Sequence, residues 1–321
     1  MTTILIDAIS MGTIFLFGCV GEILTEKAGN LNLGIPGIMC IGALGGSLGV
    51  KIYMDSAADI SEMSGFVLIL IAVLFAMIFA GGGGLIYAFL TVTLKANQNV
   101  TGLALTTFGV GFMKFFAKRI HDPEKFKVAS DFFKHIFPWS HKLGWFGDVF
   151  LSHGILVYLA IAIAVFAAIL LGKTKTGLHL RAVGENPATA DAAGINISKY
   201  KYGFILLGSA IAGLGGLYYV MDKTNGSTLA EAAIDSFGWM AVALVIATMW
   251  KPVVAIFGSI VFGGLSTLAV NLQGLSLSQL KIFDMFPYII TVVVLIFTSI
   301  FGKKEIQPPA SLGQSYFREE R

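Results

Sequence analysis

Long apolar runs alternate with shorter polar connections along the sequence of 321 residues. A helix needs about 20 mostly apolar residues to cross the hydrocarbon core of a bilayer. Nine runs approach or exceed that length, at residues 3–22, 31–50, 65–94, 99–117, 149–171, 202–221, 237–250, 252–271 and 285–301. The pattern predicts an all-α, polytopic integral membrane helix bundle of about nine transmembrane helices (eight to ten), some of them discontinuous.

Two of these runs contain residues that favour a helix break. The run at 65–94 is long enough to tilt or to break, and a break would fall at Gly81-Gly82-Gly83-Gly84. The run at 237–250 is short and joins the next through Lys251-Pro252, which is a natural helix stop. The residues before the first run lack the basic region of a cleaved signal peptide, so we expect the first span to be retained.

The composition fits a membrane location. Hydrophobic residues make up 56% of the chain and charged residues 13%, against roughly 25% charged in soluble domains. The 38 glycines allow close helix contacts, and we expect rows such as Gly42/Gly46 and Gly208/Ala212/Gly216 to be packing faces. Cys19 and Cys40 lie inside apolar runs and are expected to be small buried residues. The net charge of +3 is too small and too scattered to suggest nucleic acid as a partner.

Basic residues in short loops predict which side of the membrane each loop occupies. Loop 172–201 carries five lysines and arginines, and the tail 302–321 carries four, whereas loops 51–64 and 222–236 are acidic. We therefore expect residues 1–301 to form the transmembrane domain of a protein in the cytoplasmic membrane. Loop 172–201 and the C-terminal tail 302–321 are expected in the cytoplasm.

Segment 118–148 conflicts with this rule. It carries six basic residues, yet counting spans places it on the outer side. Asp122, Glu124, Asp131 and Asp148 offset part of its charge, although acidic residues count little in the rule. Either a span is miscounted or this segment is an exception to the rule, and we keep it outside.

No catalytic or cofactor site is visible in the sequence. Gly172-Lys173-Thr174 looks like the end of a phosphate-binding loop, but Ala167 stands where that motif needs a glycine. The five histidines show no metal-ligand spacing. We expect no enzyme activity, no metal and no cofactor in this chain. If its activity uses ATP, a partner subunit would bind the ATP and magnesium.

Loop 172–201 contains the signals of a short helix. Asn186 is a candidate N-cap, Pro187 fits the first helical position, and Gly194 is placed to end the helix after two turns. A capped helix of about seven residues is marginal in water, so it should rest against another surface. The residues alone leave open the alternative of a solvated loop whose charge only sets the topology.

The run Thr174–Pro187 (TKTGLHLRAVGENP) resembles the signature of permease subunits of bacterial ABC importers for simple sugars, nucleosides and branched-chain amino acids, in their nucleoside-type branch. Residues Glu22–Met39 resemble the link between the first two spans of the nucleoside-type permeases, with Pro36 where the family often has a glutamate. A weaker match is Thr101–Leu105. The long external segment of the family is also similar to residues 137–147, which supports the outer placement of 118–148.

The resemblance implies a coupling helix in 172–201 that docks into a groove of an ABC ATPase subunit. The implied ATPase-coupling residues are Arg181, Gly184, Glu185, Asn186, Pro187, Ala188, Asp191 and Gly194. It also implies a second, related permease subunit in a heterodimer, an extracytoplasmic solute-binding lipoprotein, and contact with membrane lipid.

Amides and hydroxyls at the starts of two spans suggest a polar path. Such groups inside apolar runs mark either helix contacts or a route for a polar substrate, and transporters place broken helix ends at their substrate sites. The candidates for the substrate path are Asn32, Asn97, Gln98, Asn99, Thr101, Thr106 and Phe108. The alternative is that the amides only cap helices at the interface.

We therefore expect a permease that imports nucleosides, in particular purine nucleosides, driven by a separate ATPase. Permeases of the same family for simple sugars, riboflavin or branched-chain amino acids remain the alternative. A secondary transporter would need membrane-buried carboxylates or a sodium site, and only Glu22 and Asp7 come near.

Overall fold

The computed structural model describes residues 2–56, 63–134, 137, 140–271, 277–301 and 307–317. Across these ranges the regular structure is helical, as the sequence predicted. The elements are α1 (Thr2–Lys27), α2 (Ile35–Ser56), α3 (Gly65–Ala88), η2 (Phe89–Thr93), α4 (Gln98–Ile120), α5 (Pro123–Phe133), η3 (Ser140–Leu143), α6 (Gly144–Phe150), α7 (Ile155–Lys173), α8 (Lys175–Glu185), α9 (Pro187–Ala192), α10 (Ile197–Tyr218), η4 (Tyr219–Lys223), α11 (Glu231–Ala247), α12 (Pro252–Asn271) and α13 (Leu277–Phe301).

Six helical segments of the described chain are long and apolar enough to cross a membrane. They are Thr2–Lys27, Ile35–Ser56, Gly65–Thr93, Gln98–Ile120, Ile155–Lys173 and Ile197–Lys223. The last three predicted runs fall in α11, α12 and α13, but the apolar stretches described in α12 and α13 are shorter, at Pro252–Thr267 and Met285–Phe297. The expected number of about nine spans is therefore not confirmed.

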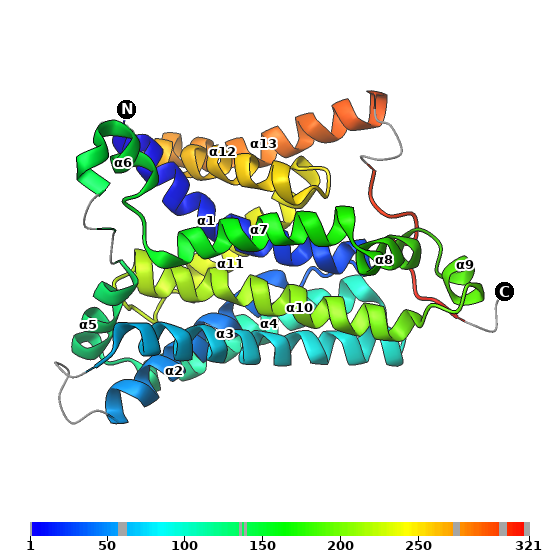
Figure 1. Cartoon of the computed structure of the whole chain (residues 1–321), viewed down its shortest axis with the longest axis horizontal. Coiled ribbons are helices and arrows are strands. Elements are labelled where there is room, and N and C mark those ends of the chain that lie inside the picture. Colours follow the sequence, from blue (N-terminus) through cyan, green and yellow to red (C-terminus); the bar gives the residue numbers. More distant parts are fainter. Residues whose placement is uncertain are drawn as a thin grey trace.

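The connections gather at two opposite ends of the bundle. In Figure 1, α5, α6 and the N-terminus lie at the left end, and α8, α9 and the C-terminus lie at the right end. We refer to the right end as the α8–α9 end. Helix α5 of segment 118–148 and helices α8 and α9 of loop 172–201 thus lie at opposite ends of the bundle. Residues 307–317 lie at the same end as loop 172–201, which fits the four helices between them.

Glycines bring the central helices α1, α2, α3 and α10 into close contact. A Cβ added to Gly42 of α2 would lie 2.4 Å from the Cα of Gly213 in α10, and one added to Gly216 would lie 2.0 Å from the carbonyl oxygen of Met39. These small residues let two backbones approach where larger side chains would clash. The predicted packing faces are confirmed. Cys19 and Cys40 are free and buried, also as expected.

The predicted break at Gly81–Gly84 is wrong. Helix α3 runs unbroken to Ala88 and continues as the π-helix η2. A broken helix would leave backbone groups without partners where no water can satisfy them. A Cβ on Gly84 would lie 2.3 Å from the hydroxyl of Ser209, so this glycine serves the contact with α10 instead.

The predicted stop at Lys251-Pro252 is confirmed. Helix α11 ends at Ala247, and α12 begins at Pro252. Met249 and Trp250 in the connecting turn have positive φ angles of 54° and 56°. This turn lies close to the end of α1, because the Trp250 indole nitrogen donates a hydrogen bond to Glu26.

Candidate coupling site and transport face

Thr174 turns the chain sharply from α7 into α8. Its hydroxyl donates to the carbonyl of Leu170 at 2.6 Å and accepts from the N–H of Gly177 at 3.0 Å. A Cβ on Gly177 would lie 2.1 Å from the Leu170 oxygen, so only glycine fits this fold-back. The sequence-based expectation of one short helix in this loop missed α8, which Thr174 caps and which packs against the end of α7.

The predicted capping pattern of α9 is confirmed. The Asn186 side chain accepts from the N–H of Thr189 at 3.0 Å, Pro187 is the first helical residue, and Gly194 adopts a positive φ of 82° just after the helix. Asn186 also ends α8, since its N–H donates to the carbonyl of Ala182. One residue thus closes the first helix and opens the second, which fixes their relative direction.

Helix α9 has only six residues and rests on a small apolar cluster. Ala190 is buried against Val183 of α8 and Ile197 of α10, with Tyr316 packed beside them. This contact supplies the support that such a short helix needs.

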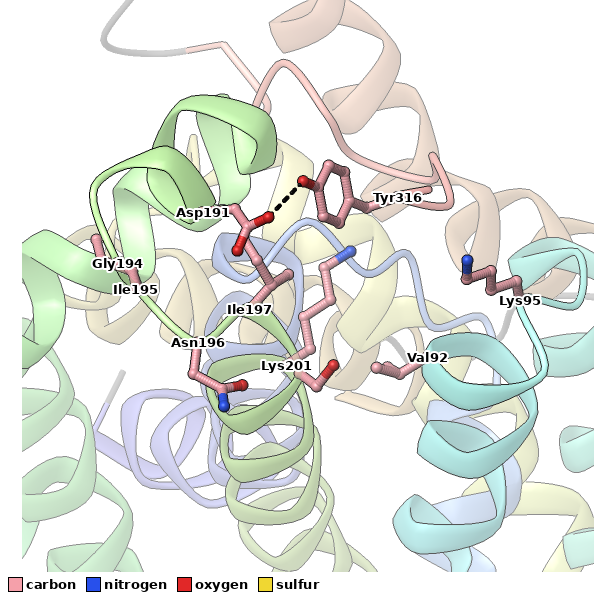
Figure 2. A pocket seen from close by; sticks show the side chains of 10 residues that line it. Val92, Lys95, Asp191, Gly194, Ile195, Asn196, Ile197, Lys201 and Tyr316 are labelled. Carbon is pink, nitrogen blue, oxygen red and sulfur yellow. Dashed lines mark hydrogen bonds between the residues drawn. The ribbon is translucent and has the colours of Figure 1, made fainter. Parts of the chain in front are cut away.

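Residues 307–317, here named the tail segment, clamp the end of α8. The carbonyl of Gly184 accepts from both the N–H of Ser311 at 3.0 Å and its hydroxyl at 2.5 Å. The Tyr316 hydroxyl donates to Asp191 at 2.9 Å, as Figure 2 shows. Gly184 is also pressed onto α1, because a Cβ there would lie 2.4 Å from the carbonyl oxygen of Lys27.

The other edge of the tail segment contacts the start of α4. Gln98 donates from its amide nitrogen to the carbonyl of Gln314 at 3.3 Å, and the Lys95 ammonium lies 4.2 Å from the ring centre of Phe317. A cavity of about 510 Å³ opens between α9, the start of α10 and the α3–α4 connection. Figure 2 shows Lys201 extending through it toward Tyr316.

The eight predicted coupling residues all lie at the α8–α9 end. Gly184 is buried, whereas Pro187 and Asp191 are half-buried. The remaining members are exposed and available to a partner: Arg181, Glu185, Asn186, Ala188 and Gly194. Sequence reasoning missed Ser311 and Tyr316, which hold this surface in place, because their contacts span 127 and 125 positions of sequence.

Several predicted path residues cap or join helices. Asn97 caps α4 by accepting from the N–H of Val100 at 3.1 Å, and the Thr101 hydroxyl donates to the carbonyl of Asn97. Gln98 is buried and accepts from the N–H of Leu31 at 2.7 Å. These contacts are the ones expected if the polar residues cap helices and do not line a path. Asn99 next to them is exposed.

Two more predicted path residues hold the α1–α2 connection. The Thr106 hydroxyl donates to the carbonyl of Leu33 at 2.8 Å. Buried Asn32 donates its N–H to Glu22 at 2.9 Å, and its side-chain oxygen accepts from the N–H of Gly34. Two carboxylates of α1 thus hold connecting segments at the α8–α9 end: Glu22 binds the α1–α2 connection, and Glu26 binds the α11–α12 turn through Trp250. Sequence reasoning had considered Glu22 only as a sign of a secondary transporter.

Helix α4 leaves one face open. The face contains Phe108, which is 50% exposed, and further exposed residues at helical spacing: Val100, Leu103, Thr107, Gly111, Lys114 and Phe115. The rings of Phe108 and Phe112 stack with their centres 5.7 Å apart. An exposed lysine within a candidate span needs water or a polar partner. Sequence reasoning missed Lys114, although it is the one charged residue in the run 99–117.

Comparison with known proteins gives consistent matches over nearly the whole chain. The sequence model of a family described as "Branched-chain amino acid transport system / permease component" matches residues 4–295. The nucleoside ABC transporter permease protein NupC of Lactococcus lactis subsp. cremoris is 28% identical, over 96% of this chain and 94% of NupC. The guanosine ABC transporter permease protein NupQ of Bacillus subtilis is 28% identical, over 94% and 92%. TsgC13 of Haloferax volcanii, which bears the name of a glucose ABC transporter permease, is 28% identical, over 97% and 96%.

Proposed function

This chain belongs to the permease family of branched-chain amino acid transport systems, and we propose that it forms part of the path for nucleosides in an ATP-driven importer. The chain is a multi-pass membrane protein and a transport subunit, not an enzyme. The observation that carries the substrate class is the similarity, over nearly the full length, to NupC and NupQ, whose names specify nucleosides and guanosine.

The open face of α4 supports this substrate class. A nucleoside combines a flat aromatic base with a polar ribose, and the stacked rings of Phe108 and Phe112 offer a surface to the base. Thr107 and Lys114 on the same face offer polar groups to the sugar. The similarity to TsgC13 makes a sugar the alternative substrate. A sugar has no flat base, so it would contact less of the surface formed by the Phe108 and Phe112 rings.

The α8–α9 end is proposed as the docking site of the ATPase subunit. Asn186, Ala188 and Glu185 are exposed there. The α8–α9 end and the tail segment would then both lie on the cytoplasmic side of the membrane. The ATPase would hold ATP and magnesium, and this chain would need no cofactor. A second, related permease would lie opposite the open face of α4, with the path between the two chains. A solute-binding lipoprotein would dock at the other end of the bundle, near α5 and α6.

The tail segment offers a mechanical connection from the docking site to the path. Movement of α8 acts on Ser311 through Gly184, and the tail segment reaches α4 through the bond from Gln98 to Gln314. Helix α4 carries the open face. Closure of the ATPase pair on ATP would therefore be transmitted to the helix that lines the path.

Uptake by vesicles that contain the complete transporter tests this proposal. With ATP inside, radiolabelled guanosine and adenosine should accumulate, and omission of ATP should abolish the accumulation. Accumulation of glucose or leucine without nucleosides would overturn the substrate class while leaving the family assignment intact.

A further inference from the structure

A basic groove lies at the α8–α9 end, on the side of α7 and α12. It has a volume of about 840 Å³ and is lined by the ends of α1, α7 and α12 and by one side of α8. Lys27, Arg181 and Lys251 contribute its positive charges, and Glu185 is the one carboxylate among its lining residues. The three cations come from three separate segments: the end of α1, α8 and the α11–α12 turn.

The nearby carboxylates of Glu185 and Glu26 offset only part of the charge of the three cations. None of them forms a salt bridge with a carboxylate of the residues that the structure describes. Lys27 is repelled by Arg181 and Lys251 and attracted by Glu185 and Glu26. Glu185 itself accepts a long hydrogen bond from the N–H of Ala310 at 3.4 Å. Cations gathered in this way repel one another, so an anion placed between them is stabilised.

The apolar surface next to the groove is continuous with the faces of two helices. Helices α7 and α12 lie side by side (Figure 1) and pack against each other. Near the groove, α7 exposes Phe166 (61%) and Ile169, and α12 exposes Val253 and Phe257 (67%). Exposed apolar side chains on candidate membrane helices are surfaces for hydrocarbon. The ligand of this groove therefore needs an anionic head and an apolar tail.

We propose that the groove binds an anionic phospholipid, with its phosphate between Lys27, Arg181 and Lys251 and its acyl chains along α7 and α12. Basic pockets at the ends of transmembrane helices on the cytoplasmic side are suited to anionic headgroups. Trp250 also lines the groove, and tryptophan favours the headgroup level of a bilayer. The groove shares Arg181 and Glu185 with the predicted coupling residues, but no residue of α9 lines it, and its other walls include the ends of helices that enter the membrane. The proposal rests on the cytoplasmic placement of the α8–α9 end in the proposed function and not on the substrate.

Native mass spectrometry of the complete transporter tests the proposal. The transporter is extracted from vesicles of equal parts phosphatidylglycerol and phosphatidylcholine, and the retained lipids are counted. We expect the wild type to retain phosphatidylglycerol in preference. Lys251→Gln should lower that preference about fivefold, as expected for one basic residue at a lipid surface. The matched control is Lys199→Gln, an exposed lysine of α10 at the same end but outside the groove, and it should behave as wild type.

Three results would overturn the proposal. The first is equal retention of the two lipids by the wild type, and the second is equal preference in Lys251→Gln and Lys199→Gln. The third is an efficient cross-link between Lys251→Cys and the ATPase subunit, because the ATPase would then occupy the groove. The natural cysteines Cys19 and Cys40 are buried, so the introduced thiol can be labelled selectively.

Discussion

The carbonyl oxygen of Gly184 accepts two hydrogen bonds from Ser311, one from its N–H at 3.0 Å and one from its hydroxyl at 2.5 Å. Ser311 is buried, and it closes the tail segment onto the end of α8. The same glycine lies against the end of α1. The last turn of α8 is therefore held from two sides, so a force applied to α8 or α9 passes into the helix bundle.

Replacement of Ser311 tests this clamp. Ser311→Ala removes the hydroxyl bond and keeps the backbone bond, which weakens the tail contact by about 1 kcal/mol, or about fivefold in its population. We expect fewer guanosine molecules to be transported per ATP hydrolysed, with the ATPase still bound. Ser315→Ala is the control, because its hydroxyl makes only a 3.5 Å contact with the carbonyl of Lys95. An unchanged transport ratio in Ser311→Ala would contradict the clamp.

Removal of the α9 cap should weaken ATPase docking. Asn186→Ala removes the acceptor for the N–H of Thr189 and costs about 1 kcal/mol of helix stability. In a six-residue helix this loss should melt α9, and co-purification of the ATPase should fall. Asn186→Asp keeps a capping oxygen and should retain most of the association. Equal co-purification of wild type and Asn186→Ala would refute a docking role for this helix.

The aromatic surface of α4 should determine substrate affinity. Phe108→Ala removes a ring from the open face, and the loss of one stacking contact raises KM for guanosine about fivefold to tenfold. Phe108→Tyr keeps the ring and should behave close to wild type. Phe66→Ala removes an exposed ring from α3, away from the open face, and should leave KM unchanged. Similar KM values in Phe108→Ala and Phe66→Ala would exclude Phe108 from the path.

The helix contact at Gly42 should tolerate no side chain. A Cβ there would lie 2.4 Å from the Cα of Gly213, so Gly42→Ala forces two backbones apart and should destabilise the protein by about 1–3 kcal/mol. Gly82→Ala is the control, because a Cβ at that position meets nothing within 4 Å. Thermal unfolding in detergent should show a lower Tm for Gly42→Ala alone. A common Tm for both variants would mean that the contact is looser than the structure shows.

Acid should destabilise the region around His153. Burial lowers the pKa of this histidine below its usual value of 6.5, and its Nε2 lies 2.9 Å from the carbonyl of Val149. The unfolded chain then binds the proton more readily than the folded chain, so this contribution lowers stability as the pH falls through 6.5. Tm measured from pH 8 to pH 5 should fall less in His153→Gln than in wild type. Parallel curves for the two proteins would contradict this role.

Local rules predicted the local features of this protein. The cap at Asn186, the first position at Pro187 and the turn at Gly194 depend on a few neighbouring residues, and the structure has all three. The helix stop at Lys251-Pro252 is of the same kind. The predicted break at Gly81–Gly84 was wrong because glycine weakens a helix in water, whereas the membrane leaves the backbone no other partner.

Contacts between distant residues could not be predicted from the sequence. Nothing near Ser311 or Tyr316 indicates that they bind Gly184 and Asp191, because these pairs form only when α10–α13 return the chain to the same end. Gln98 was predicted for the substrate path from its polarity, but only the fold shows that it joins Leu31 to Gln314. Lys114 could have been found in the sequence as a lone charge in an apolar run, but only the structure shows that it lies on the open face of α4.

The separation of 127 positions between Gly184 and Ser311 also bears on biogenesis. At the usual pace of translation the ribosome needs about ten seconds to travel from one residue to the other. During that interval α8 and α9 have already been synthesised, but the tail segment that holds them in place has not. A nascent or prematurely terminated chain would thus insert into the bilayer before its α8–α9 end is stabilised. Binding of the proposed ATPase subunit would then wait until synthesis is complete.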